Sequence, residues 1–295
     1  MAHFGEAERS IQQYFVVGEY VEFNSQNYII KKSGKPTCKN GEPKTDIYIL
    51  LANEQSGEVE IKISYKKENA DFLENKIKAE RAEQLFGSKW YSLIEQSTSK
   101  IKDKFFAKPL IYKNKNKRTE KGAITLGWKF ELMNKLSGEL SGEMLLNKEQ
   151  YLDVYAGNNL PPDKRNSFVN GEKIDNSGVA NYILIGNQFS SAQAILAKIE
   201  HVEDYVTHCP KIYFACKALN YRTFASKYDG DRPLAVQVKW GHQNGKLSPT
   251  LTFNQPLQIN GKEVKEQLLT CLKTLEIETT DDINENNAEM SCVHQ

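Results

Sequence analysis

The sequence predicts an α/β protein in which helices flank a mixed central β-sheet. Three patterns predict this class: helical spacing of apolar residues over 5–16, two strand patterns over 46–51 and 58–64, and a second helical pattern over 70–86. Apolar residues make up 39% of the 295-residue chain and aromatic residues 10%, which is enough for a sizeable core. The order of helix, strands and helix therefore indicates one sheet with helices packed against it.

The N-terminal elements follow from local periodicity. In the first helix, Ala7, Ile11 and Phe15 recur at helical spacing and form an apolar side. Two β-rich pieces within residues 19–32 are separated by the polar stretch 24–27, which predicts a hairpin or a bent strand. These elements lead through a loop rich in Gly, Pro, Lys and Asn into the first of the two strand patterns.

The strand patterns over 46–51 and 58–64 carry side chains that could bind a metal ion and take part in catalysis. Because side chains on a strand alternate between two faces, the apolar residues of the second strand should face the core, while Glu60 and Lys62 share the other face. We expect the first strand to deliver Asp46 beside them. Two carboxylates are suitable ligands for Mg²⁺, which activates a bound water and neutralises charge on a phosphate. The amine of Lys62 would orient or deprotonate the attacking water, or stabilise the developing charge.

These residues resemble a known nuclease motif. Pro43-Lys44-Thr45-Asp46, thirteen intervening residues and then Glu60-Ile61-Lys62 resemble the PD-(D/E)XK motif of the type II restriction endonuclease superfamily. In that family the Asp begins one strand, the Glu-X-Lys lies on the next, and a glutamate from the preceding helix often assists. The resemblance implies that Asp46 and Glu60 bind the metal and that Lys62 is the catalytic lysine. The chain departs from the motif in that Lys44 and Thr45 separate the Pro from the Asp.

Several residues are candidates for the auxiliary glutamate, and other segments compete with Glu60-Ile61-Lys62 as the motif. Glu8, on the first predicted helix, is the candidate for the helix-borne glutamate, with Glu6, Glu19 and Glu22 as alternatives. Other Glu-X-Lys copies begin at residues 42, 74 and 263, in a loop or in helical patterns, so the tripeptide gains meaning only on the alternating strand. A weaker competitor is the strand-like Gln237-Val238-Lys239, with Asp229 and Asp231 upstream.

The chain carries a net charge of only +1, but its basic residues are unevenly distributed. Nine lysine or arginine residues and two acidic residues lie between positions 100 and 121, a local charge of +7. Lys and Arg side chains supply most of the sequence-independent affinity for DNA, and Arg, Lys and Asn also read base edges. The candidate DNA-binding residues are Lys113, Lys115, Lys117, Arg118 and Lys121, then Lys164, Arg165 and Asn166, and finally Arg222.

The remaining sequence predicts further elements and a division of the chain. We expect strands over 123–134, 179–185 and 211–215, a helix over 190–199, a hairpin with its turn at 243–246, and a last helix over 263–275. The expected organisation is a catalytic core over 1–160, a C-terminal half over 161–280 that packs on the same core and supplies DNA-recognition elements, and a flexible acidic tail over 281–295.

The expected function is Mg²⁺-dependent hydrolysis of double-stranded DNA at a short specific site, in the manner of a type II restriction endonuclease. A palindromic site would favour a homodimer, because each DNA strand needs its own active centre. Five widely spaced cysteines, the lack of a long apolar run and an acidic N-terminus favour a cytoplasmic protein without a membrane partner. The alternatives are a repair or junction-resolving nuclease of the same fold, a non-catalytic DNA-binding module, and a protein-interaction domain.

Overall fold

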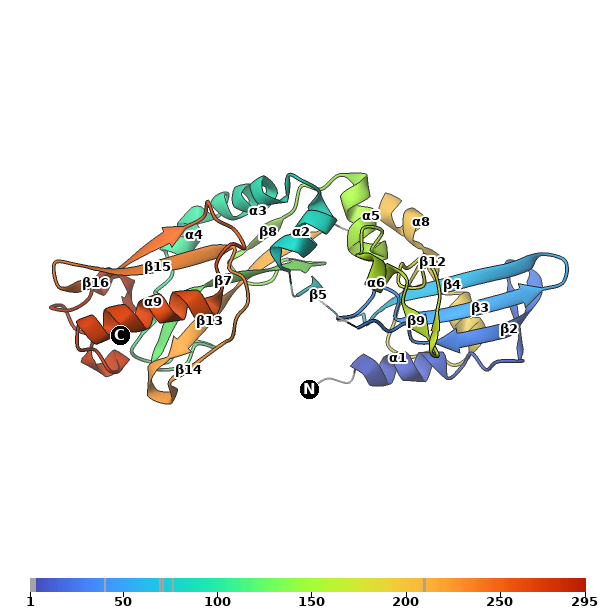
Figure 1. Cartoon of the computed structure of the whole chain (residues 1–295), viewed down its shortest axis with the longest axis horizontal. Coiled ribbons are helices and arrows are strands. Elements are labelled where there is room, and N and C mark those ends of the chain that lie inside the picture. The colour runs from blue at the N-terminus through green and yellow to red at the C-terminus, as the bar shows by residue number, and fades with distance from the viewer. Residues whose placement is uncertain (1–3, 40, 69, 71, 76, 209–210) are drawn as a thin grey trace. The chain divides into compact units, whose positions relative to one another are not determined.

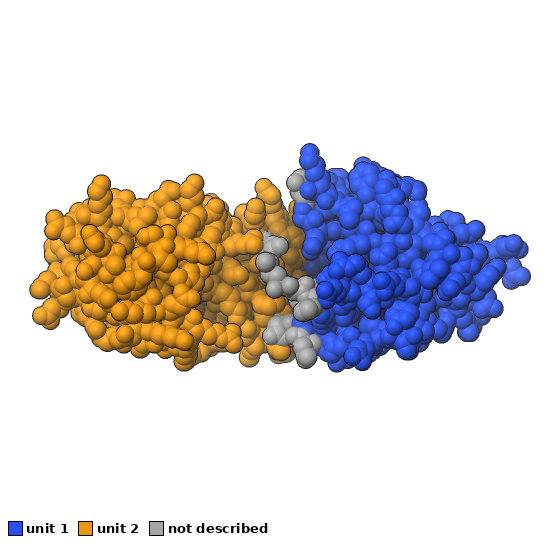
Figure 2. Space-filling view, turned by 90° about the horizontal axis from the view of Figure 1, so that it is seen from below, with its two compact units in different colours: residues 1–71, 146–210 blue, residues 72–145, 211–295 orange. Residues whose placement is uncertain are grey.

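The computed structural model describes residues 4–39, 41–68, 70, 72–75, 77–208 and 211–295. The chain divides into two compact units, each built from two separated segments (Figures 1 and 2). Unit 1 contains residues 1–71 and 146–210, and unit 2 contains residues 72–145 and 211–295. The division expected at residues 160 and 161 differs from these units because long-range strand pairing, rather than chain order, decides which segments belong together. Both units combine helices with sheets, which confirms the predicted α/β class. The strands, however, divide between separate sheets and do not form the one central sheet that was expected.

Unit 1 is organised around a mixed sheet with the strand order β1-β2-β3-β4-β11-β12. Its strands are β1 (Tyr20–Phe23), β2 (Gln26–Gly34), β3 (Ile47–Asn53), β4 (Gly57–Lys66), β11 (Tyr182–Ile185) and β12 (Glu200–His201), and a separate ribbon consists of β9 (Phe168–Val169) and β10 (Glu172–Lys173). Its helices are α1 (Phe4–Gln12), α5 (Lys148–Ala156), α6 (Pro162–Arg165), α7 (Ala192–Leu196) and α8 (Val202–Thr207). Strand β11 runs parallel to β4, whereas the pairs from β1 to β4 are antiparallel.

The two predicted hairpins of unit 1 are present. Strands β1 and β2 are joined by Asn24 and Ser25, both with positive φ, which is the geometry of the tight turns that suit twisted antiparallel strands. Strands β3 and β4 pair from Asn53 opposite Gly57 to Ile47 opposite Ile63 (Figure 1). The patterns over 46–51 and 58–64 therefore correspond to adjacent strands, as predicted.

The core of unit 1 lies on the face of the sheet that the alternation predicts. Ile61 and Ile63 are fully buried and belong to one apolar cluster with Ile47 and Ile49. Apolar residues of the N-terminal segment and of α7 complete this cluster: Ile11, Phe15, Ile195 and Leu196. On the other face of β4, Glu60 and Lys62 are only partly buried, whereas Ser64 is buried.

Unit 2 contains a larger sheet with the main strand order β14-β13-β7-β15-β16. Its strands are β5 (Phe72–Glu74), β6 (Ile111–Tyr112), β7 (Ala123–Met133), β8 (Ser141–Glu143), β13 (Tyr213–Arg222), β14 (Lys227–Tyr228), β15 (Val236–Gln243), β16 (Lys246–Thr252) and β17 (Val293–His294). Its helices are α2 (Ala79–Phe86), α3 (Trp90–Ser99), α4 (Lys102–Phe106) and α9 (Gly261–Thr274), with short 3₁₀ turns at Thr223–Ala225, Thr280–Asp282 and Met290–Cys292.

The core of unit 2 forms where helices meet strands β7 and β15. Helix α9 packs on both strands, and it begins with a capping box in which Asn260 and Glu263 exchange side-chain and backbone bonds. Phe105 of α4 packs edge-on against Trp128 of β7, with 5.0 Å between ring centroids. The predicted hairpin turn is also present, because Gln243 of β15 pairs with Lys246 of β16.

Two local predictions are wrong. The single helix expected over 70–86 is divided: β5 pairs with β7, and α2 begins only at Ala79, because long-range pairing of Phe72 with Met133 prevails over helical periodicity. Residues 69, 71 and 76 of this region lie outside the described residues. The expected flexible tail over 281–295 is instead folded into unit 2: Ile283 and Ala288 are buried, and β17 pairs with β6.

Candidate active site

Asp46 lies immediately before β3 and is fixed to the end of β4 by two hydrogen bonds. Its backbone N–H donates to the carbonyl of Ile63, and its carboxylate accepts from the N–H of Tyr65, both at 2.8 Å. Burial raises the pKa of Asp46 to about 6, an effect that the positive charge of Lys66 opposes and the negative charge of Glu8 reinforces. Asp46 is thus a carboxylate that is held rigidly in an environment disfavouring its charge.

Glu8, on helix α1, is a second carboxylate, and its negative charge acts on Asp46. Glu8 accepts a hydrogen bond from Lys35, with 2.5 Å between Nζ and Oε2, and its side chain is only 14% exposed. Lys35 follows β2; burial acts to lower its pKa, but the bond to Glu8 and the charges of Glu8 and Asp46 raise it overall. Glu8, Lys35, Asp46 and Lys66 are two acids and two amines coupled through their charges, and we name this group the strand-end centre.

Lys66 is a residue of this centre that the sequence patterns did not single out. It is the last residue of β4, and its charge is the leading influence that favours the ionised form of Asp46. A signal was present, since the alternation that places Glu60 and Lys62 on one face extends through Ser64 to Lys66. The Glu-X-Lys tripeptide instead directed the prediction to Lys62.

Glu60 and Lys62 form a separate, internally bonded cluster in the middle of β4. Lys62 Nζ lies 3.3 Å from Glu60 Oε2, and the buried Tyr48 hydroxyl donates to Glu60 Oε1 at 2.5 Å. Burial and the bond to Glu60 raise the pKa of Tyr48. Asn181, just before β11, accepts from the N–H of Lys62 at 2.7 Å and donates to the carbonyl of Glu60 at 2.9 Å. These contacts bind the Glu60 and Lys62 segment to the neighbouring parallel strand.

The strand register separates Asp46 from Glu60. Glu60 is paired with Leu50, which lies four residues beyond Asp46 along the same strand. At about 3.3 Å per residue, this offset is about 13 Å along the sheet. Mg²⁺ binds oxygen ligands at about 2.1 Å, so carboxylates that share one ion lie much closer together than this. The prediction that Asp46 and Glu60 bind one metal ion, with Lys62 beside them, therefore does not fit the register.

The strand-end centre contains donor groups of the kind that Mg²⁺ prefers. This ion is commonly held by one or two carboxylates and completes its coordination with water and phosphate oxygens. Glu8 and Asp46 provide two carboxylates from different elements, and the raised pKa of Asp46 reflects a site where a nearby cation would be favourable. Within the residues that the structure describes, no group of three or more His, Cys, Asp or Glu side chains forms a larger metal site.

Comparisons with known proteins identify no relative. No protein-family model, curated protein or solved structure matches the chain. The resemblance to the PD-(D/E)XK motif therefore rests on the residues of this sequence alone.

The basic residues predicted to bind DNA are distributed over both units. In unit 2, Lys113 and Lys121 contact the C-terminal segment, and Lys117 lies 3.3 Å from Glu139. Lys115 and Arg118 are exposed and make no polar contact with described residues. In the same unit, Arg222 bonds to Glu120 and Asp229, and these two ion pairs raise its pKa overall.

The predicted loop in unit 1 is partly engaged in its own structure. The guanidinium of Arg165 donates to the carbonyl of Asn158, and the side chain of Asn166 accepts from the N–H of Asn176 at 2.9 Å. Lys164 is partly buried, and its ammonium group lies beside Gly41. Arg165 and Asn166 thus make contacts that hold the loop in its own conformation.

The competing motif in unit 2 does not form a carboxylate site. Gln237 is buried and contacts Gln255, whereas Asp229 binds Arg222 and Asp231 accepts from the Tyr228 hydroxyl. The described residues contain no helix that is long and apolar enough to span a membrane.

Proposed function

We propose that unit 1 hydrolyses phosphodiester bonds of double-stranded DNA with Mg²⁺, in the manner of a type II restriction endonuclease. The observation that carries the proposal is the strand-end centre, where the charges of Glu8, Lys35 and Lys66 all act on the buried Asp46 and Lys35 is paired with Glu8. Paired acids and an amine are the groups that metal-dependent phosphoryl hydrolysis requires. The proposal assigns Glu8 and Asp46 to the metal and Lys66 to the phosphate or the attacking water.

The arrangement of elements supports this proposal. Asp46 precedes β3, the Glu-X-Lys tripeptide lies on β4, and Glu8 lies on the helix before the sheet. This is the order that the resemblance to the PD-(D/E)XK superfamily implies. The departure concerns the amine, because Lys66 rather than Lys62 acts on Asp46. We therefore retain the reaction class and reassign the lysine.

The chemistry of the centre follows from its charges. Bound Mg²⁺ would lower the pKa of a coordinated water and offset charge on the phosphate. Asp46 and Glu8 bind a cation only when ionised, so hydrolysis should increase as the pH rises through about 6, the pKa of Asp46. The Lys66 ammonium would stabilise negative charge that develops on the phosphate oxygens, and Lys35 would keep Glu8 oriented.

The proposal includes DNA contacts and a dimer. Lys115 and Arg118 of unit 2 have ammonium and guanidinium groups available for phosphates. Two active centres, one for each DNA strand, would be provided by a homodimer. Sedimentation velocity with and without a cleavable duplex tests this part, and a monomer under both conditions would contradict it.

The decisive experiment compares the two lysines. Plasmid DNA is incubated with the wild type, Asp46→Ala, Lys66→Ala and Lys62→Ala in Mg²⁺, and DNA binding is measured in Ca²⁺. Asp46→Ala should abolish cleavage, and Lys66→Ala should reduce its rate by about 10²–10³-fold, the usual effect of removing one group that stabilises transition-state charge. Lys62→Ala should retain more activity than Lys66→Ala, because its amine is paired with Glu60.

Each result has a defined meaning. Undiminished cleavage by Asp46→Ala would contradict the site, and a greater loss in Lys62→Ala than in Lys66→Ala would restore the original assignment of the lysine. Salt-sensitive DNA binding without cleavage in any divalent metal would instead favour a non-catalytic DNA-binding module. Sequencing the fragment ends would identify the recognition site.

A further inference from the structure

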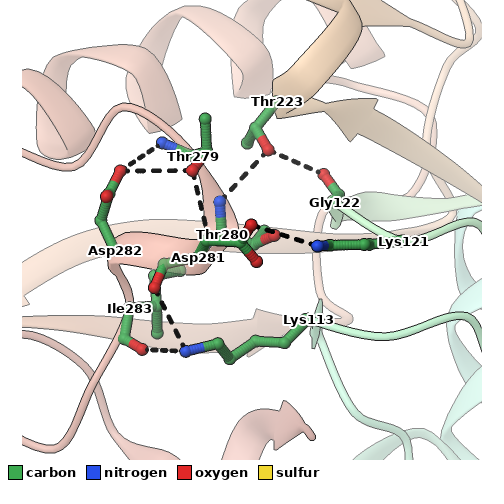
Figure 3. A network of polar contacts seen from close by, with 9 residues as sticks. All are labelled: Lys113, Lys121, Gly122, Thr223, Thr279, Thr280, Asp281, Asp282 and Ile283. Carbon is green, nitrogen blue, oxygen red and sulfur yellow. Dashed lines mark hydrogen bonds and ion pairs between the residues drawn. The ribbon is translucent and has the colours of Figure 1, made fainter.

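The C-terminal acidic segment lies on two lysines of the basic run in unit 2. Lys121 Nζ is 3.1 Å from a carboxylate oxygen of Asp281, and Lys113 Nζ is 2.6 Å from the carbonyl oxygen of Ile283 (Figure 3). Lys113 Nζ also lies 3.4 Å from the carbonyl oxygen of Asp281. The oxygen atoms of this segment thus contact the same ammonium groups that would bind phosphate oxygens of DNA.

Buried neighbours hold this segment in place. Thr280 is fully buried, and its N–H donates to the Thr223 hydroxyl at 3.2 Å, while that hydroxyl donates to the carbonyl of Gly122 (Figure 3). On the other side of Asp281, Ile283 is also fully buried. The carboxylate of Asp281 is therefore held at a defined position next to Lys121, rather than on a mobile chain end.

The ion pair itself is accessible and replaceable. The side chains of Lys121 and Asp281 are 50% and 51% exposed, so water screens their attraction and breaking it costs little. The Lys121 ammonium also lies 5.0 Å from the ring centroid of Phe224, which is itself 51% exposed. A polyanion can approach Lys121 from solvent, but only against the negative charge of Asp281.

We propose that the C-terminal segment around Asp281 is a built-in competitor that occupies the basic surface of unit 2 and weakens its binding to DNA phosphates. The inference rests on the nucleic-acid partner of the proposed function and not on its hydrolytic chemistry. In this arrangement the Asp281 carboxylate takes the place of a phosphate oxygen on Lys121. The basic run then holds DNA less strongly than its local charge of +7 suggests.

The experiment measures binding of the full chain to a short fluorescein-labelled DNA duplex by fluorescence anisotropy in EDTA, where hydrolysis is excluded. Asp281→Asn should tighten binding about threefold, because the released Lys121 ammonium would attract a phosphate about 6 Å away in water by an amount of that size. The logarithmic dependence of affinity on salt should become steeper by about 0.9, because one further lysine displaces a counterion.

Glu285→Gln provides the matched control. Glu285 belongs to the same segment and is exposed, but it makes no polar contact with described residues, so its replacement changes net charge equally without releasing Lys121. A double-mutant cycle completes the test, because Asp281→Asn should have no effect on affinity when Lys121 is already replaced by Gln.

The outcomes separate this inference from the proposed hydrolysis. Tighter binding by Asp281→Asn alone would support it even if the wild type cut no DNA. Equal gains in Asp281→Asn and Glu285→Gln would overturn it, since net charge alone would then explain the effect. An undiminished gain in the Lys121→Gln background, or no measurable binding by either the wild type or Asp281→Asn, would also overturn it.

Discussion

Replacing Asp46 by Asn should remove a pH-dependent cost to the stability of unit 1. The pKa of this carboxyl rises from 3.8, its ordinary value, to about 6 in the folded protein. Between these values the folded state keeps a proton that the unfolded state has lost, so the free energy of unfolding decreases as the pH rises from about 4 to 6. At 1.36 kcal/mol per pH unit, the loss amounts to at most about 3 kcal/mol above pH 6.

The side chain of Asn does not titrate, so Asp46→Asn should not lose stability as the pH rises. Its amide oxygen can still accept the bond from the N–H of Tyr65, so the contact at the end of β4 is preserved. Relative to the wild type, the variant should therefore gain stability progressively above pH 4, by up to about 3 kcal/mol at pH 7. This would be a site at which function is retained at the expense of stability.

The measurement must distinguish the two units. Trp90, Trp128 and Trp240 all belong to unit 2, so tryptophan fluorescence reports on that unit. Hydrogen-exchange mass spectrometry of peptides from β3 and β4, corrected for the intrinsic pH dependence of amide exchange, reports the opening free energy of unit 1. Asp175→Asn, which changes an exposed aspartate of the same unit, is the charge-matched control. Equal pH dependence in the wild type and Asp46→Asn would refute the reasoning.

Two further substitutions test how each unit is held together. Asn181→Ala should lower the stability of unit 1 by about 1–3 kcal/mol, because its carboxamide satisfies two backbone groups of β4, and the same exchange measurement checks this. Ile283→Ala should lower the stability of unit 2 by about 2–5 kcal/mol through loss of a fully buried side chain. Urea denaturation followed by tryptophan fluorescence measures that loss, while Glu285→Ala on the exposed surface should leave the transition unchanged.

Local patterns in the sequence were sufficient to predict individual strands and hairpins. Alternation identified β4 and the side that Ile61 and Ile63 bury, and the pair Asn244-Gly245 identified the turn between β15 and β16. These features depend on backbone conformations and side-chain directions that neighbouring residues determine. These strands and turns could therefore be predicted without knowledge of the rest of the chain.

Features that depend on pairing between residues far apart in the sequence could not be predicted from local patterns. Phe72 has apolar neighbours at helical spacing, yet it pairs with Met133 about sixty residues later. The C-terminal segment was predicted to be flexible because it is polar and acidic, but a few apolar residues such as Ile283 are enough to anchor it. The interleaving of the two units has the same origin, since each is completed by a segment that returns from far along the chain.

The position of the candidate centre could have been predicted from the register of the β3–β4 hairpin. In an antiparallel hairpin, residues at equal distances from the centre of the turn face each other. The turn between β3 and β4 is centred on Gln55, so the partner of Asp46, nine residues before it, is Ser64, nine residues after it. Glu60 lies only five residues beyond this centre, so it must pair with Leu50. A tight hairpin thus excludes the expected ligand pair and brings the end of β4, with Lys66, to Asp46.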